Sequence, residues 1–142
     1  TSVVSALFDK QNPERKSLTE SFWGVIKDFH PYISEITVAE IERTPDFELR
    51  NNMMGTVSLF SIISVTDDIE ELAKEYISRG AVPEGFIEDA YHIAIATINE
   101  MDCLLSWNFK HIVRRKTRDI VRMVNSINNL KSIEIMTPAE LL

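Results

Sequence analysis

Residues 88–96 read EDAYHIAIA, and this stretch decides the fold. Its apolar side chains recur with the spacing of one helical face, which predicts a helix over about residues 85–101. The short apolar run Cys103–Ser106 follows and predicts a buried strand. The alanines at 90, 94 and 96 leave room for a neighbouring strand to approach the helix closely. A helix of this kind followed at once by a buried strand is typical of an α/β protein with a parallel sheet.

Strands and helices alternate through the rest of the chain. Strands are predicted over residues 32–34, 62–65 and 132–136, and helices over about 13–29, 38–43, 46–59, 67–79 and 117–130. This alternation indicates a single α/β domain, a three-layer α/β/α sandwich around a central, mainly parallel sheet. Ligands bind such folds at the carboxyl ends of the strands, which are here the positions directly after residues 34 and 106.

The composition of the chain excludes several classes of protein. The 142 residues match one domain, 44% of them are hydrophobic, and no apolar run approaches the roughly 20 residues that cross a bilayer. No positively charged hydrophobic leader opens the chain, and Cys103 is the one cysteine, so we expect a cytoplasmic protein without a membrane partner. The chain has four glycines and no glycine-rich phosphate loop, which ranks a flavodoxin-like nucleotide-binding or regulatory domain low.

The formal net charge is −7, which does not suit a protein that coats nucleic acid without specificity. A metal-dependent nuclease stays compatible with this charge, because carboxylates gathered at a metal site are themselves negative. Positive charge is concentrated in one run, which comprises Lys110, His111, Arg114, Arg115, Lys116, Arg118 and Arg122. Arg115, Arg118 and Arg122 fall on one face of the predicted helix. Arg115 and Arg118, with Lys110 and His111, are candidates for RNA phosphate contacts. A solvated helix, or one that docks an acidic partner, is the alternative.

Four residues stand out as candidates for chemistry. Asp89 lies at the edge of the apolar helical face, where a carboxylate is partly desolvated and needs a partner; solvation, or pairing with a lysine or arginine, is the alternative. Asn108 follows the predicted strand. It could be a neutral ligand of a metal or water, or it could cap the turn, and its spacing favours the cap. His111 has no second histidine or cysteine at metal-ligand spacing, which argues against zinc and leaves a phosphate contact or a surface residue. Glu40, taken alone, reads as an ordinary exposed glutamate.

Four short segments resemble, in the same order, the four motifs of one family. They are Thr1–Phe8, Ser34–Ile41, Asp89–Ala96 and Leu104–Asn108. Each is similar to a motif of the PIN domains, the fold of small metal-dependent ribonucleases such as the VapC-like toxins. The resemblance extends over essentially the whole chain. It implies a PIN-like fold and a metal-dependent endoribonuclease, the toxin of a toxin–antitoxin pair.

The resemblance also implies a site. PIN domains gather three or four acidic residues at one end of the sheet and bind Mg²⁺ or Mn²⁺ there, which activates water for attack on a phosphodiester. In this chain Glu40 and Asp89 would be metal ligands. Asn108 would be a weaker, neutral contributor, and Ser2 would hydrogen-bond the acid cluster. The family's first strand and its aspartate would directly precede Thr1, and we expect the native protein to have an aspartate there.

The same resemblance implies partners. These are an RNA substrate, a small antitoxin protein and a second copy of the chain, since dimers are common in such domains. Exposed apolar side chains between Phe47 and Phe60, with Met53 and Met54, are candidates for the antitoxin contact, although methionines there are more often core filler. The alternative function is a catalytically weak or inactive PIN scaffold that binds RNA or a protein, and Asn108 in place of an acid favours it.

Overall fold

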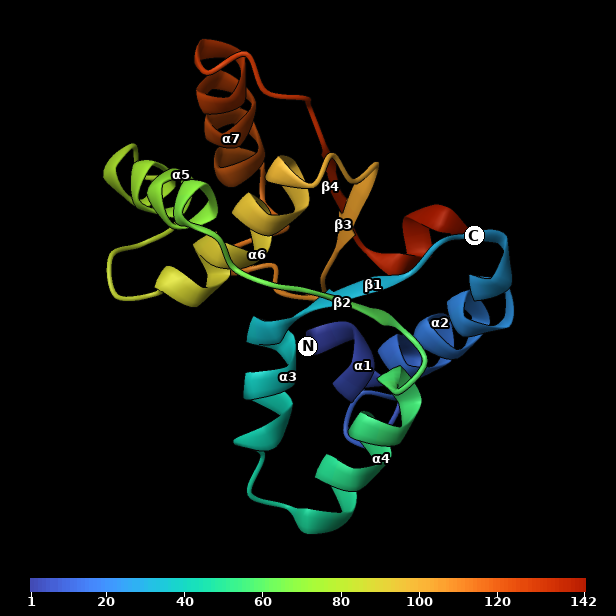
Figure 1. The fold of residues 1–142 in the computed structure, drawn as a ribbon. Helices are drawn as coiled ribbons and strands as arrows, with labels where there is room; N and C mark the ends of the chain where they lie inside the picture. Colours follow the sequence, from blue (N-terminus) through green and yellow to red (C-terminus); the bar gives the residue numbers. More distant parts are fainter. The chain divides into compact units, whose positions relative to one another are not determined.

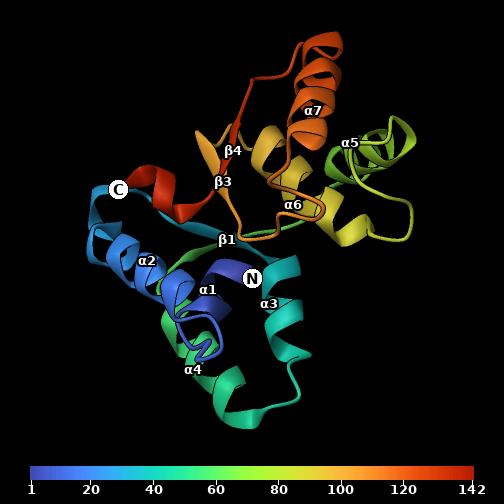
Figure 2. The ribbon, with the colours of Figure 1, turned by 180° about the vertical axis from the view of Figure 1, so that it is seen from behind.

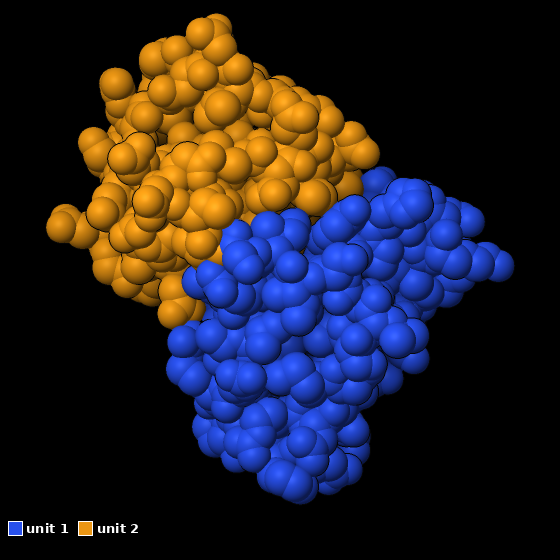
Figure 3. Space-filling view, in the orientation of Figure 1, with its two compact units in different colours: residues 1–64, 137–142 blue, residues 65–136 orange.

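The computed structural model describes residues 1–142 and contains seven α-helices, two 3₁₀-helices and four short strands. The chain divides into two compact units, which Figure 3 distinguishes by colour. Unit 1 comprises residues 1–64 and 137–142, and unit 2 comprises residues 65–136. No helix combines the length and the apolar character that crossing a membrane requires. Each unit is described by itself below.

Unit 1 consists mainly of helices around one pair of strands. Its elements are α1 (Ser2–Ala6), α2 (Pro13–Gly24), the 3₁₀-helix η1 (Ile26–Asp28), β1 (Tyr32–Ser34), α3 (Glu35–Glu42), α4 (Phe47–Val57), β2 (Ser61–Ile63) and the 3₁₀-helix η2 (Pro138–Leu141). Strands β1 and β2 are parallel, with Ile33 opposite Ile62. Figures 1 and 2 both show α1 between α3 and α4. The centre of the unit is a cluster of Val4, Ile41, Met53 and Val57.

Unit 2 places three long helices beside a second pair of strands (Figures 1 and 2). Its elements are α5 (Asp67–Ser78), α6 (Ile87–Ile98), β3 (Cys103–Leu105), α7 (Arg115–Ile127) and β4 (Glu134–Met136). Strands β3 and β4 are parallel, with Leu104 opposite Ile135. Helix α5 packs along α6, whose residues Ala90, Ile93 and Ala94 are completely buried. The apolar face predicted for residues 85–101 therefore does face the core.

The predicted α/β class with parallel strand pairing is confirmed. The strand at 32–34 is found as predicted, whereas the helix predicted from residue 38 begins at Glu35. The reason is Ser34, which ends β1 and also caps α3, because its hydroxyl accepts a hydrogen bond from the Thr37 N–H at 3.2 Å. The four strands form two separate two-stranded sheets, so a three-layer sandwich around one central sheet stays a prediction.

A buried polar network ties three helices of unit 2 together. The Tyr76 hydroxyl on α5 donates to Asn125 Oδ1 on α7 at 2.5 Å and lies 3.1 Å from the Thr97 hydroxyl on α6. All three side chains are buried almost completely. Burial raises the pKa of Tyr76 to about 12, although its hydrogen bonds with Thr97 and Asn125 oppose this shift. The network therefore stabilises the packing of the helices only while the phenol keeps its proton.

Replacing Tyr76 by phenylalanine tests this network. We expect Tyr76→Phe to lower the free energy of unfolding by about 1–3 kcal/mol, because the buried Asn125 carbonyl loses its donor. The unfolded tyrosine releases its proton near pH 10, whereas the folded one holds it to about pH 12, so stability falls as pH rises between these values. Urea unfolding measured across pH 9–12 should show a steeper alkaline loss for the wild type than for the variant. Parallel curves would contradict this account.

Three helices of unit 2 end in the same way, with a residue of positive φ directly after the cap. These residues are Gly80 (φ 81°), Glu100 (φ 55°) and Asn129 (φ 56°). After α5, the Gly80 N–H donates to the Ile77 carbonyl and the next N–H donates to the Tyr76 carbonyl, which closes the helix end. Glycine enters this left-handed region without strain, whereas a glutamate side chain is strained there.

Two substitutions with opposite expected signs test these helix ends. We expect Glu100→Gly to raise the free energy of unfolding by about 0.5–1 kcal/mol, because it removes left-handed strain at a small entropic cost. Gly80→Ala should lower the free energy of unfolding by about 1 kcal/mol, because an alanine side chain is strained in the left-handed region that Gly80 occupies. Chemical denaturation at neutral pH measures both. A loss of stability in Glu100→Gly would show that its side chain, and not its backbone, matters at this position.

Candidate active site

The beginning of α6 presents a carboxylate in its first turn. Asp89 is the third residue of the helix, and its backbone N–H donates to the Phe86 carbonyl at 3.1 Å. The partial positive charge at a helix amino terminus stabilises a negative side chain in this position. The helix ahead is apolar and buried, so the Asp89 side chain is only 17% exposed. The desolvation expected for Asp89 from the sequence is therefore found.

A histidine partners this carboxylate. His111 Nδ1 lies 2.9 Å from Asp89 Oδ2, and the histidine side chain is 12% exposed. The Phe86 ring lies against the imidazole, with the ring centroids 4.1 Å apart. The other carboxylate oxygen, Oδ1, makes no hydrogen bond within the chain. One oxygen of Asp89 is thus held in place, while the second is free to accept a bond from a ligand or water.

A tight turn after β3 positions this histidine. Asn108 Oδ1 accepts hydrogen bonds from the backbone N–H groups of Lys110 (3.1 Å) and His111 (3.0 Å). The Asn108 N–H in turn donates to the Ser106 hydroxyl at 2.9 Å. On the far side, the Thr117 hydroxyl lies 3.1 Å from the His111 carbonyl and 2.6 Å from the Ala81 carbonyl, which is the closer acceptor of its proton. Asn108 therefore caps the turn, which is the alternative that spacing favoured, and both lone pairs of its carbonyl oxygen have donors.

In unit 1, Glu40 lies in the second half of α3 and is partly buried. The Thr1 hydroxyl donates to Glu40 Oε1 at 2.5 Å. Burial lowers the pKa of the Thr1 amino group, and the nearby negative charge of Glu40 opposes that shift. Ser2, the residue predicted to bond the acid cluster, begins α1 directly after Thr1. Glu40 is thus a paired carboxylate and not the ordinary exposed glutamate that its local sequence indicates.

The basic run of the sequence separates into groups with different surroundings. Lys110 is exposed, and the Arg115 side chain is 95% exposed with a long 3.6 Å contact to Asp119. Arg114 is used within the fold, because it donates to the Thr117 hydroxyl (2.7 Å) and the Ala81 carbonyl (3.2 Å). Arg118 is partly buried beside a small hollow between α7 and the residues leading into β4. The run is therefore not one continuous cationic surface.

Unit 2 brings Asp89, Asn108 and His111 together, and unit 1 brings Glu40 to the segment that contains Ser2. Comparison with family models, curated proteins and solved structures finds no match to this chain. No three His, Cys, Asp or Glu side chains gather where they could hold one metal ion. The donor chemistry nonetheless fits Mg²⁺ or Mn²⁺, because Asp89 offers a free carboxylate oxygen and such ions prefer oxygen ligands.

Sequence reasoning missed two contacts of these acids. It treated His111 as a phosphate contact or a surface residue, and it did not single out Thr1. The partners are 22 residues apart for Asp89 and 39 apart for Glu40, so no helical or strand periodicity links them. The sequence did contain one indication of the His111 contact. An Asx turn at Asn108 reverses the chain after β3, which brings the following residues back toward α6.

The turn makes a direct prediction about Asn108. Asn108→Asp keeps an oxygen that accepts the two backbone N–H bonds, so its free energy of unfolding should stay within about 0.5 kcal/mol of the wild type. Asn108→Ala removes the acceptor, and a loss of about 1–2 kcal/mol should follow. Thermal and urea unfolding measure both values. Equal losses in the two variants would mean that the amide N–H₂ group, and not the carbonyl oxygen, stabilises the turn.

Proposed function

We propose that this protein is a metal-dependent endoribonuclease of the PIN type. The observation that carries the proposal is the geometry of Asp89, a mostly buried carboxylate with one oxygen held by His111 and the other without a hydrogen bond. Oδ1 is not among the buried atoms that lack a partner, so it is accessible to solvent and can accept a bond from a ligand. Its place at the start of the helix that resembles the third PIN motif supports the same conclusion.

Asp89 and Glu40 would hold the metal ion, Mg²⁺ or Mn²⁺. Magnesium sites on nucleic-acid enzymes commonly use one or two carboxylates, with water and substrate phosphate completing the shell, so a two-carboxylate site is sufficient. When bound, the ion supplies an activated water and neutralises charge on the phosphate. Asp89 orients that site through its bond to His111, and Thr1 restricts the Glu40 side chain.

The proposal includes the finer fold, a three-layer sandwich in which both strand pairs belong to one central parallel sheet. Its support is physical. Isolated two-stranded sheets are marginal in water, and parallel strands occur almost only in sheets covered on both faces. Ile62 in β2 is 59% exposed, which is unusual for a strand in a parallel pair. A larger sheet with further layers removes both anomalies.

The proposed partners are RNA, a small antitoxin protein and a second copy of the chain. Between Phe47 and Phe60, the two methionines serve unit 1 itself, since Met53 is buried in the core and Met54 packs against it. The core-filler alternative is therefore right for both. Phe47 and Leu59 are 68% and 95% exposed, and these two apolar side chains stay candidates for a protein contact.

A specific observation favours the alternative, a PIN scaffold without catalysis that binds RNA or a protein. Three of the implied site residues already have partners within the chain. Asp89 is bonded to His111, Glu40 is bonded to Thr1, and the Asn108 carbonyl is occupied by two backbone N–H groups. In this alternative the same hydrogen bonds serve only the stability of the fold.

Cleavage of single-stranded RNA in Mn²⁺ separates the two functions. Asp89→Asn keeps the contact to His111 but loses the charge, and Glu40→Gln does the same in unit 1. We expect each to reduce cleavage by about 100-fold and to weaken Mn²⁺ binding, measured by electron paramagnetic resonance of the free ion. Glu84→Gln, an exposed acid ahead of α6, is the matched control and should leave both unchanged.

Two results would contradict the nuclease. Cleavage that is equal in all four proteins would come from a contaminant. Cleavage that is absent in the wild type, together with unaltered Mn²⁺ binding in Asp89→Asn, would favour the scaffold.

A further inference from the structure

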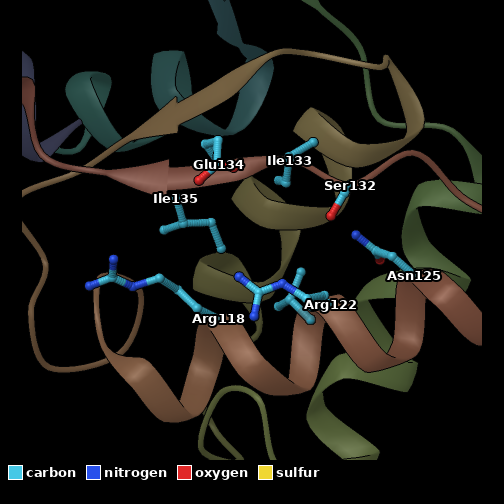
Figure 4. A pocket seen from close by; sticks show the side chains of 8 residues that line it. Arg118, Arg122, Asn125, Ser132, Ile133, Glu134 and Ile135 are labelled. Atoms are coloured by element: carbon cyan, nitrogen blue, oxygen red, sulfur yellow. The ribbon is translucent and has the colours of Figure 1, made fainter. Parts of the chain in front are cut away.

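Unit 2 offers a ligand an accessible surface at the two segments that form the Asp89–His111 pair. The hollow between α7 and residues 132–135 (Figure 4) has room for about one water molecule, so it cannot hold a nucleotide. The start of α6 and the turn after β3 instead expose large apolar side chains, namely Phe86 (48% exposed), Ile87 and Phe109 (52% exposed). The other exposed large apolar side chains of unit 2 lie on α7.

The local backbone fixes Phe86 in its exposed position. The Phe86 N–H donates to the Pro83 carbonyl at 3.2 Å, which closes a turn that has Gly85 as its third residue. Gly85 has a φ of 94°, a conformation that glycine adopts without strain. Phe86 then occupies the N-cap position of α6, three residues before Asp89. Side chains at this separation are neighbours on a helix, so the ring is held close to the Asp89 carboxylate.

One side of the Phe86 ring is covered, and the rest is open. The His111 imidazole lies against the ring, with the centroids 4.1 Å apart and the planes inclined by 48°. Because Phe86 is nevertheless half exposed, the side of the ring away from His111 is accessible to solvent. The imidazole behind the ring is itself bonded to Asp89. A flat group can therefore stack on a ring whose orientation is already set.

The charges near this ring favour a ligand that combines a neutral flat part with an anionic part. Glu84 is exposed, and Glu88 is partly exposed. These acids repel an anion placed on the ring, whereas they repel a neutral base little. Lys110 lies in the turn that holds His111, is exposed, and makes no ion pair with its ammonium group. It can attract a phosphate that is joined to the stacked group.

We infer that Phe86 stacks an unpaired base of single-stranded RNA beside Asp89. Surfaces that bind single strands combine aromatic side chains, on which bases stack, with cations that contact the backbone. Phe86 supplies the ring, Lys110 supplies the cation, and Phe109 exposes a second ring next to Lys110. Stacking is independent of base identity, but it requires an unpaired base. The inference rests on the proposed function insofar as RNA is the ligand, and it requires no cleavage.

Variants of Phe86 test the stacking. Phe86→Leu removes the aromatic face but keeps an apolar side chain, whereas Phe86→Tyr keeps the face. Binding of a fluorescent eight-nucleotide oligouridine is measured in EDTA, so that no metal-dependent cleavage interferes. We expect Phe86→Leu to raise the dissociation constant about tenfold, the loss of one base–aromatic stack, and Phe86→Tyr to change it less than about twofold. The slope of log affinity against log salt should stay the same, because stacking releases no counterions.

Tyr32 supplies the matched control. It is also an aromatic side chain with 48% exposure, but it begins β1, whereas ligands bind parallel sheets at the carboxyl ends of the strands. Tyr32→Leu should therefore change the dissociation constant less than about twofold. A loss as large as that in Phe86→Leu would overturn the inference, because any exposed ring would then have the same effect.

A measurement on the unmodified chain protects the test against a folding defect in Phe86→Leu. An abasic oligomer with the same ribose–phosphate backbone should bind the wild type at least about tenfold more weakly than the oligouridine. Removing the bases should weaken binding to Phe86→Leu by a factor about tenfold smaller, because one stack is already lost. Equal binding of both oligomers by the wild type would overturn the inference in favour of a backbone contact. Displacement of the oligouridine by uridine 5′-monophosphate at the same concentration as by unlabelled oligouridine would overturn it in favour of a mononucleotide site.

The test fails separately from the proposed function. Equal RNA affinity of the wild type and Phe86→Leu overturns the inference, leaves Phe86 as a candidate for a protein contact, and leaves the nuclease proposal standing. Absence of cleavage in the wild type removes the nuclease and leaves the binding results in EDTA valid.

Discussion

The candidate site of unit 2 depends on the hydrogen bond between the Asp89 carboxylate and the His111 ring. A carboxylate that is 83% shielded from water needs compensation, and it receives it from two sources. The amino terminus of α6 supplies partial positive charge, and the imidazole supplies a directed donor. The imidazole reaches the carboxylate only because the turn after β3 returns the chain to the start of α6. The bond therefore links helix, strand and turn into one arrangement.

In the proposed site, the Asp89 carboxylate both bonds His111 and binds a ligand. One oxygen of Asp89 is committed to His111, so the orientation of the other is set before any ligand arrives. Glu40 is treated similarly in unit 1, where the Thr1 hydroxyl restricts its side chain. Sites built in this way lose little side-chain entropy when a cation or phosphate binds. The bonds that occupy the two acids are therefore compatible with the ligand binding proposed for them.

The sequence predicted those features of the fold that depend on residues close together in the chain. The apolar period of residues 88–96, the Pro13 start of α2 and the Gly80 end of α5 each act within a few residues, and all three are found. The early start of α3 was missed because Ser34 belongs to a strand and caps a helix at once. The pairing of His111 was missed because it depends on how a turn redirects the chain in three dimensions. How the strand pairs combine is likewise a matter of long-range packing, which periodicity does not encode.

The basic run illustrates why residue type alone is a poor guide to an interface. Its cations look equivalent in sequence, yet Arg114 is bonded to Thr117 and the Ala81 carbonyl, Arg115 is solvated, and Arg118 holds a buried donor without an acceptor. A solvated arginine gains little from meeting a phosphate, because it exchanges one well-screened environment for another.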